Sequence, residues 1–120
     1  MVDLSQHTRK FQKEMNAGIS SLILLSVLSQ SETPLYGYQI AKMLEENSSQ
    51  APMMKQGTLY PVLRSLEENE LLASMVEPSV SGPPRRYYQI TPAGRAALAE
   101  WVKIWQQTKI FVDSNLRDLK

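Results

Sequence analysis

Four side chains near the middle of the chain could contact base edges in the major groove of DNA. They are Gln56, Thr58, Tyr60 and Arg64. Glutamine can form paired hydrogen bonds with adenine, arginine can do so with guanine, and a threonine methyl group can pack on thymine. Gly57 would let the backbone approach closely, and a helix start attracts phosphate. This chemistry predicts a helix that enters the groove by its amino-terminal half.

A second set of side chains could contact phosphates, which positions a protein on DNA without reading its sequence. The set comprises Tyr36, Tyr38 and Lys55 together with the adjacent pair Arg85 and Arg86. The two arginines would straddle a phosphate or reach the minor groove. The net charge is only +1, so any basic footprint must come from the placement of these residues.

Two of these residues also have a plainer interpretation. Tyr60 could pack against the preceding helix, because tyrosines are often half-buried. Arg64 could pair with Glu67 or Glu68 on its own helix, a weak interaction that does not exclude contact with DNA. Of the neighbouring tyrosines at 87 and 88, we expect Tyr88 to face the core.

The helix that would carry the four base-reading residues has one apolar stripe, formed by Leu59, Val62, Leu63 and Leu66. Thr58 is expected to be its N-cap, because Pro61 then lies in the first turn, where a missing N–H costs nothing. A start one turn earlier would cost one hydrogen bond. The helix is expected to end near Asn69, which can adopt a left-handed conformation.

The elements around this helix are predicted from periodicity and turn residues. Helices are expected over residues 11–29 and 36–47, and short strands over 73–78 and 85–90, joined by a projecting Gly/Pro loop. Thr91 and Pro92 begin a last helix that can run to about residue 117. A seam along it indicates a partner helix, with these members: Leu98, Trp101 (or Val102), Trp105, Thr108, Val112, Asn115 and Leu119. Leu116 is also expected at the dimer interface.

This order of elements predicts a winged helix-turn-helix, a mainly α fold with a two-stranded wing. The 120 residues suit one domain with an appendage. We expect a flexible tail over residues 1–10, the winged DNA-binding unit over 11–90 and a dimerisation helix over 91–120.

Several other functions lack the residues that they need. The chain has no cysteine and one histidine, His7, which argues against disulfides, thiolate catalysis and a transition-metal site. It has no phosphate-binding glycine motif and no nucleophile–base set, so neither an enzyme nor a cofactor is expected. The longest apolar run, over 19–28, is too short to span a bilayer. A cytoplasmic protein is expected.

Three motifs resemble those of the PadR family of bacterial transcriptional regulators: YGYQI at 36–40, GTLYPVLRSLE at 57–67 and RRYYQITPAG at 85–94. The single last helix resembles the compact branch of that family. The resemblance implies a dimeric winged-helix repressor that binds an inverted repeat and is released by a small ligand. Two residues depart from the family pattern. Gln39 stands where an acidic residue is common. Glu70 stands where glycine is usual and would not easily adopt a positive φ, so Asn69 is expected to terminate the helix.

A ligand site is predicted from two tryptophans one turn apart, Trp101 and Trp105. Ordinary dimer packing would also explain them. In a two-fold dimer, however, Trp105 would approach its own copy, and a gap between two indoles would accept a planar aromatic molecule. Met15, Ile19 and Ser20 of the first helix could line the same space.

Two function classes other than an enzyme therefore remain. The first is a sequence-specific DNA-binding repressor. The second is a winged-helix module that binds another protein, for which binding would be nearly independent of salt and of the two wing arginines.

Overall fold

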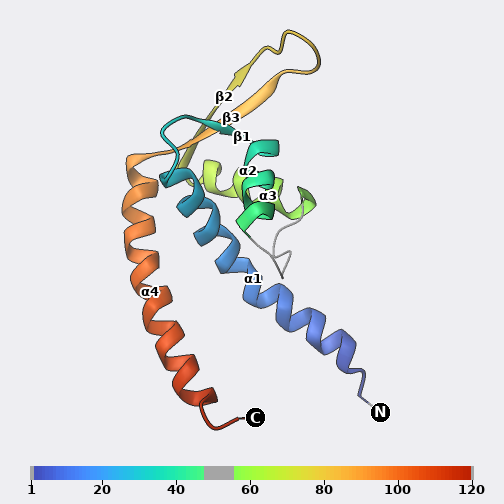
Figure 1. Ribbon diagram of the computed structural model, residues 1–120, viewed down its shortest axis with the longest axis vertical. Helices are drawn as coiled ribbons and strands as arrows, with labels where there is room; N and C mark the ends of the chain where they lie inside the picture. The colour runs from blue at the N-terminus through green and yellow to red at the C-terminus, as the bar shows by residue number, and fades with distance from the viewer. Residues whose placement is uncertain (1, 48–55, 120) are drawn as a thin grey trace.

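The computed structural model describes residues 2–47 and 56–119. Its elements, in chain order, are α1 (Leu4–Ser29), β1 (Leu35–Tyr36), α2 (Gly37–Asn47), α3 (Gln56–Glu68), β2 (Leu72–Glu77), β3 (Arg85–Ile90) and α4 (Pro92–Leu116). The β2–β3 hairpin projects at one end of an elongated molecule, and the two long helices α1 and α4 extend from the other (Figure 1). This is the expected mainly α winged-helix arrangement.

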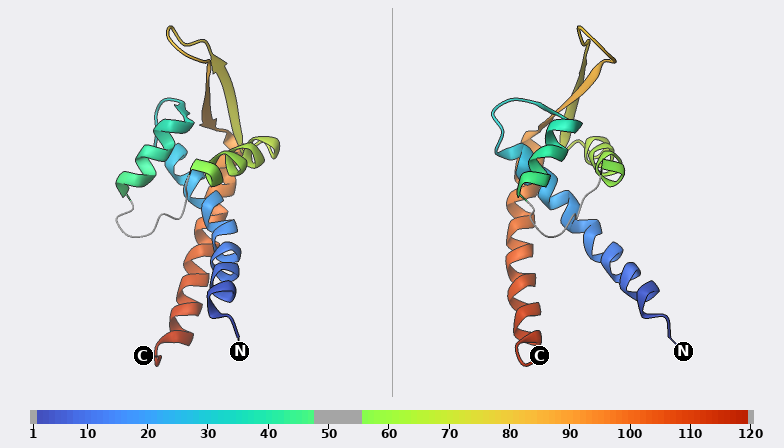
Figure 2. Two further views of the ribbon diagram at one scale, coloured as in Figure 1. Left: turned by 90° about the vertical axis from the view of Figure 1, so that its right-hand side faces the viewer. Right: turned by 45° about the vertical axis from the view of Figure 1, so that its right-hand side comes forward.

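One hydrophobic core joins all the elements. Its buried members are Leu24, Leu25 and Leu28 of α1, Leu35 of β1, Ile40 of α2, Leu59, Leu63 and Leu66 of α3, and Leu72 and Tyr88 of the sheet. The predicted apolar stripe of α3 therefore faces inward, and the opposite face of α3 is turned to solvent. Below the core, α1 and α4 separate toward their free ends (Figure 1; Figure 2, right).

The first helix begins earlier than expected, at Leu4 instead of residue 11. Asp3 caps it, since its carboxylate accepts hydrogen bonds from the backbone N–H groups of Ser5 at 3.0 Å and Gln6 at 3.4 Å. The hydroxyl of Ser5 donates to the same carboxylate and lowers the pKa of Asp3. The prediction of a flexible tail over residues 1–10 is therefore wrong for Leu4–Lys10, which are helical. That prediction rested on the polar composition of these residues and did not include a cap at Asp3.

Helix α3 also begins earlier than expected, at Gln56, so Thr58 is not its N-cap and Pro61 lies inside the helix. Pro61 has no N–H to donate to the carbonyl of Gly57, so one intrahelical hydrogen bond is lost. The full burial of Leu59 and Leu63 accounts for the helix continuing through this defect, because packing of an apolar face outweighs a single hydrogen bond.

Helix α3 ends at Glu68, and the left-handed residue that terminates it is Glu70, whereas the sequence had indicated Asn69. Glu70 has φ +63° and is the only non-glycine residue with positive φ in the described ranges. The Leu71 N–H donates to the Leu66 carbonyl and the Glu70 N–H to the Glu67 carbonyl, both at 2.9 Å. This pair of hydrogen bonds is a Schellman motif, which requires a left-handed residue at this position.

Replacing Glu70 by glycine should therefore stabilise the protein. Glycine adopts φ +63° without strain, so the free energy of unfolding should rise by about 1 kcal/mol and the melting temperature by about 4 °C. Thermal and urea unfolding measure both. The control is Glu68→Gly inside the last helical turn, which should lose about 1 kcal/mol. An E70G protein no more stable than the parent would contradict the prediction.

The sheet has three antiparallel strands in the order β1–β3–β2, one more than the predicted wing. In the additional strand, Leu35 pairs with Tyr88 and Tyr36 with Tyr87. Strand β3 spans 85–90 as predicted, whereas β2 lies one residue earlier than expected. The added strand places Tyr36 at the base of the wing.

The start of α4 is joined to the end of α3. The Thr91 hydroxyl accepts from the Gly94 N–H at 2.9 Å, as predicted for an N-cap, and also donates to the Glu70 carbonyl at 2.8 Å. The Thr91 N–H donates to the Leu71 carbonyl at 3.2 Å. The buried Gly94 packs on that same carbonyl. One turn of α4 thus closes the loop that follows α3.

Candidate nucleic-acid interface

The solvent face of α3 carries three of the predicted base-reading side chains. Thr58, Tyr60 and Arg64 are exposed, while Leu59 and Leu63 between them are buried. Within the described ranges no carboxylate forms an ion pair with Arg64. Lys55 lies outside the described residues, and of Gln56 only the backbone is described. The described part of this face therefore offers a hydroxyl, a phenol and a guanidinium to solvent.

Tyr60 packs against the start of α2, as its plainer interpretation expects, and is still exposed. A Cβ atom placed on Gly37 would lie 2.5 Å from Tyr60 Cε1 and 2.7 Å from its phenol oxygen. Only glycine at the start of α2 allows the ring to lie this close. The Tyr60 side chain nevertheless remains 41% exposed. The contact with Gly37 fixes the direction in which the phenol leaves α3.

An aromatic cluster at the base of the wing holds Arg85. The guanidinium carbon of Arg85 lies 4.5 Å from the centroid of the Tyr36 ring. That ring meets Tyr87 edge-on at 5.3 Å and stacks with Tyr38 at 6.4 Å. A cation over a ring face keeps its N–H groups available at the edges. Arg85 is therefore oriented by Tyr36 while it stays exposed.

Gln39 performs the role that an acidic residue would have at the start of α2. Its Oε1 accepts a hydrogen bond from the Tyr36 N–H at 3.0 Å, as the third helical residue does in a capping box. An amide oxygen serves this purpose as a carboxylate would. The departure from the family pattern at Gln39 thus leaves the local geometry intact.

Arg86, unlike Arg85, is engaged by polar groups of the protein. Its Nη1 donates to Ser74 Oγ at 2.8 Å and lies 4.0 Å from Glu67 Oε2. The Ser74 hydroxyl in turn donates to the same Glu67 carboxylate. Tyr88 is buried beside them, as predicted, and burial raises the pKa of its phenol, with a smaller contribution from Glu67.

A hollow of about 630 Å³ lies between the start of α2, the solvent face of α3 and the wing. Phenol, guanidinium and small side chains line it, from Tyr36, Gly37, Tyr38, Tyr60, Arg64, Ser79, Ser81, Pro83, Pro84, Arg85, Arg86 and Tyr88. Hydroxyl and guanidinium donors around a concave surface suit a chain of phosphates. The structure thus brings together six of the nine predicted DNA-contacting residues. Thr58 lies on the same helix outside the hollow.

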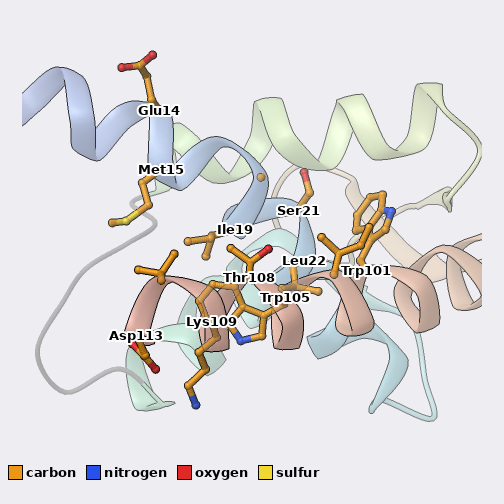
Figure 3. A pocket seen from close by; sticks show the side chains of 13 residues that line it. Glu14, Met15, Ile19, Ser21, Leu22, Trp101, Trp105, Thr108, Lys109 and Asp113 are labelled. Atoms are coloured by element: carbon orange, nitrogen blue, oxygen red, sulfur yellow. The ribbon is translucent and has the colours of Figure 1, made fainter. Parts of the chain in front are cut away.

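A second hollow, of about 700 Å³, lies where α1 and α4 separate. All four residues of the predicted ligand site line it: Met15, Ile19, Trp101 and Trp105. Figure 3 shows Met15 and Ile19 extending from α1 toward α4, which carries both indoles. Ser20 is instead buried, on the other side of α1. The structure describes no group of three or more acidic or histidine side chains that could hold a metal ion.

The predicted seam of α4 divides into two parts. Leu98 and Trp101 pack on the core of their own chain. Trp105, Thr108, Val112 and Leu116 are exposed. Two further apolar side chains widen this exposed part, Ile104 at 60% and Phe111 at 69% exposure. Sequence reasoning missed both because it followed a single seam. None of the described helices is long and apolar enough to cross a membrane.

The comparisons with known proteins agree on one family. Residues 24–100 match the transcriptional regulator PadR-like family. An uncharacterized protein of Lysinibacillus sphaericus is 31% identical over 102 residues, 85% of this chain and 91% of that protein. A transcriptional regulator of Mycobacterium tuberculosis is 47% identical over 60 residues, 50% of this chain and 55% of that regulator.

Solved structures agree with this match. A PadR-like transcription factor from Bacteroides fragilis is similar with a TM-score of 0.71 and 28% identity, covering 88% of this chain and 97% of that one. A PadR family transcriptional regulator from Eggerthella lenta gives 0.76 and 29%, covering 98% and 97%. With the winged fold and the basic, phenolic hollow beside α3, these matches show that the chain belongs to the PadR-like family of transcriptional regulators.

Proposed function

We propose that this chain is a sequence-specific repressor that binds an inverted-repeat DNA site as a homodimer. The observation that carries the proposal is the exposed α3 face beside the hollow. Helix α3 enters the major groove with Thr58, Tyr60 and Arg64, and Arg85 and Tyr38 contact the phosphate backbone. Such a regulator works where the DNA is, so we place it in the bacterial cytoplasm.

The homodimer is supported by apolar side chains on α4 that nothing in the described chain covers. Trp105, Phe111, Val112 and Leu116 are all at least 42% exposed, which is unusual for so many large apolar groups on one helix of a monomer. A two-fold axis beside α4 would pair each seam with its copy. It would also repeat α3 on the DNA about one helical turn apart.

Selection of bound duplexes from a random pool, repeated at two salt concentrations, tests this function. A palindromic consensus with half-sites about one helical turn apart, bound less tightly at higher salt, is expected. No enrichment would contradict DNA recognition. A partner protein bound with little salt dependence would favour the winged-helix interaction module instead.

We further propose that a planar aromatic molecule relieves repression by binding beside Trp105. The support is the hollow between α1 and α4, whose lining is mainly apolar and includes both indoles. Titration with planar aromatic compounds should change tryptophan fluorescence saturably. The Trp105→Ala protein should lose this response. If no such compound alters the fluorescence of the parent protein, this part of the proposal fails.

Gly37→Ala should weaken DNA binding without unfolding the protein. The new methyl group would displace the Tyr60 ring, whose far end is free to move, so the free energy of unfolding should change by less than about 0.5 kcal/mol. DNA affinity should fall several-fold, because the phenol leaves α3 in another direction. In a Tyr60→Ala background the same substitution should have no further effect. An equal loss in both backgrounds would contradict the role given to Tyr60.

A further inference from the structure

Three polar side chains connect the end of α3 to both strands of the wing. Glu67 lies in the last turn of α3, Ser74 on β2 and Arg86 on β3. Arg86 Nη1 donates to Ser74 Oγ at 2.8 Å, and the Ser74 hydroxyl donates to Glu67 Oε2. Arg86 also lies at ion-pair distance from that oxygen, at 4.0 Å. We call these residues the wing–helix triad.

We propose that the wing–helix triad fixes the angle between the wing and α3, and that of the two wing arginines only Arg85 contacts phosphate. Arg86 is thus a positioning residue for DNA recognition. This inference rests on the proposed function, because it assigns roles within the same DNA-binding surface.

The alternation of side chains along β3 gives the two arginines different surroundings. Tyr88, two residues after Arg86, is buried toward the core, and Ser74 pairs with Tyr88 across the strands. Residues two apart on a strand share a face, so Arg86 shares the face that α3 covers. Arg85 lies on the other face with Tyr87, whose strand partner is Tyr36. Both arginines line the hollow, but they leave β3 on opposite faces, and Arg86 is held by Ser74 and Glu67.

The existing contacts of the two guanidinium groups also differ. To bind a phosphate, Arg86 would have to release the Ser74 hydroxyl and the Glu67 carboxylate. The Glu67 side chain, which is 33% exposed, would then lie beside the DNA without its cation. Arg85 would give up nothing, because the Tyr36 ring occupies only the face of its guanidinium and leaves the N–H edge open. The charge of Arg85 is therefore available to DNA, whereas the guanidinium of Arg86 already has Glu67 as a partner at 4.0 Å.

Angle control matters because α3 and the wing must meet the duplex together. Random duplex is held mainly through phosphates, whereas a specific site also demands the correct register of α3. Loosening the wing–helix triad should therefore reduce the preference for the specific site more than the affinity for random duplex. Removing a phosphate contact should instead weaken both.

The test compares Arg85→Ala, Arg86→Ala and Ser74→Ala on two probes: a duplex selected by the parent protein and a scrambled duplex of equal length. Affinities are measured over a series of potassium chloride concentrations. Arg85→Ala should lower the slope of log affinity against log salt by about 0.9 per protomer and weaken both duplexes equally. Arg86→Ala and Ser74→Ala should leave the slope unchanged and reduce the selected-over-scrambled ratio by about tenfold.

Ser74→Ala keeps the inference testable if Arg86→Ala fails to fold, since it breaks the bridge without changing charge. Ser114→Ala, which removes an exposed hydroxyl on α4, is the matched control and should change neither quantity. The Ser74→Ala/Arg86→Ala double variant should have the same selected-over-scrambled ratio as Arg86→Ala alone. An Arg86→Ala slope that falls as far as that of Arg85→Ala would overturn the inference, as would an unchanged ratio in both triad variants. Failure of the parent protein to select any duplex would instead refute the proposed function.

Discussion

Replacing Gly94 by alanine should lower the free energy of unfolding by about 3 kcal/mol. The added Cβ would lie 2.7 Å from Ile90 Cγ1 and closer still to the carbonyl oxygen of Leu71. That carbonyl belongs to the backbone and accepts the Thr91 N–H, so it cannot move without breaking the junction between α3 and α4. Urea unfolding followed by far-UV circular dichroism measures the loss.

Gly18→Ala is the matched control, because Gly18 is also helical but has nothing within 4 Å of the position of its Cβ. This substitution should stabilise α1 by about 1 kcal/mol, the usual preference of a helix interior for alanine. Comparing Gly94→Ala with Gly18→Ala therefore distinguishes the effect of close packing on stability from the effect of helix propensity. If Gly94→Ala were as stable as Gly18→Ala, the contact with Leu71 would not be important for stability.

Replacing Arg64 by alanine should reduce affinity for the selected DNA site about tenfold to a hundredfold and relax the preference at one base position. Arg64 is exposed on α3, at the edge of the hollow. Its removal should therefore leave the free energy of unfolding within about 0.5 kcal/mol of the parent. Fluorescence anisotropy with the selected duplex and single-base variants of it measures both effects.

Arg64→Lys and Arg9→Ala are the controls for this result. Lysine keeps the charge but cannot form the paired hydrogen bonds of a guanidinium, so the base preference should be lost while the salt slope is kept. Arg9 is exposed on the amino-terminal half of α1, and its loss should change affinity little. Equal weakening of every duplex by Arg64→Ala would show a phosphate contact instead of base recognition.

Most of the fold follows from local patterns in the sequence. The apolar spacing of Leu59 and Leu63 identified the buried side of α3. Thr91 and Pro92 marked the start of α4. The alternation of side chains predicted both the first and the last residue of β3. Each of these signals is carried by neighbouring residues and needs no knowledge of the rest of the chain.

Apart from the start of α1, where the cap by Asp3 is local, the errors arose where distant segments meet. Glu70 adopts a left-handed conformation because Leu71 packs on the core and the Glu70 carbonyl receives the Thr91 hydroxyl, and both partners are set by the tertiary structure. Strand β1 has only two residues, too few to show a period, and is defined by its pairing with β3. Pro61 is tolerated inside α3 because burial outweighs one missing hydrogen bond.

The candidate sites show the same division. Seam spacing brought Trp101 and Trp105 together, and the structure adds Met15 and Ile19 as expected. The engagement of Arg86 was not foreseen, because Glu67 and Ser74 reach it from two other elements. The sequence of one strand shows where its charged side chains lie along that strand, but not which of them have partners on other elements.

The hydrogen bonds of Thr91 bear on how the molecule opens. Its hydroxyl accepts from the Gly94 N–H in the first turn of α4 and donates to the Glu70 carbonyl after α3. Its N–H donates to the Leu71 carbonyl. Neither helix end can fray without releasing the other. The amide hydrogens of Leu71, Thr91 and Gly94 should therefore exchange with heavy water at a common rate, as members of one opening unit. A fragment cut after residue 90 would retain every residue of α3. It would still lose the two hydrogen bonds that Thr91 donates to the carbonyls following this helix.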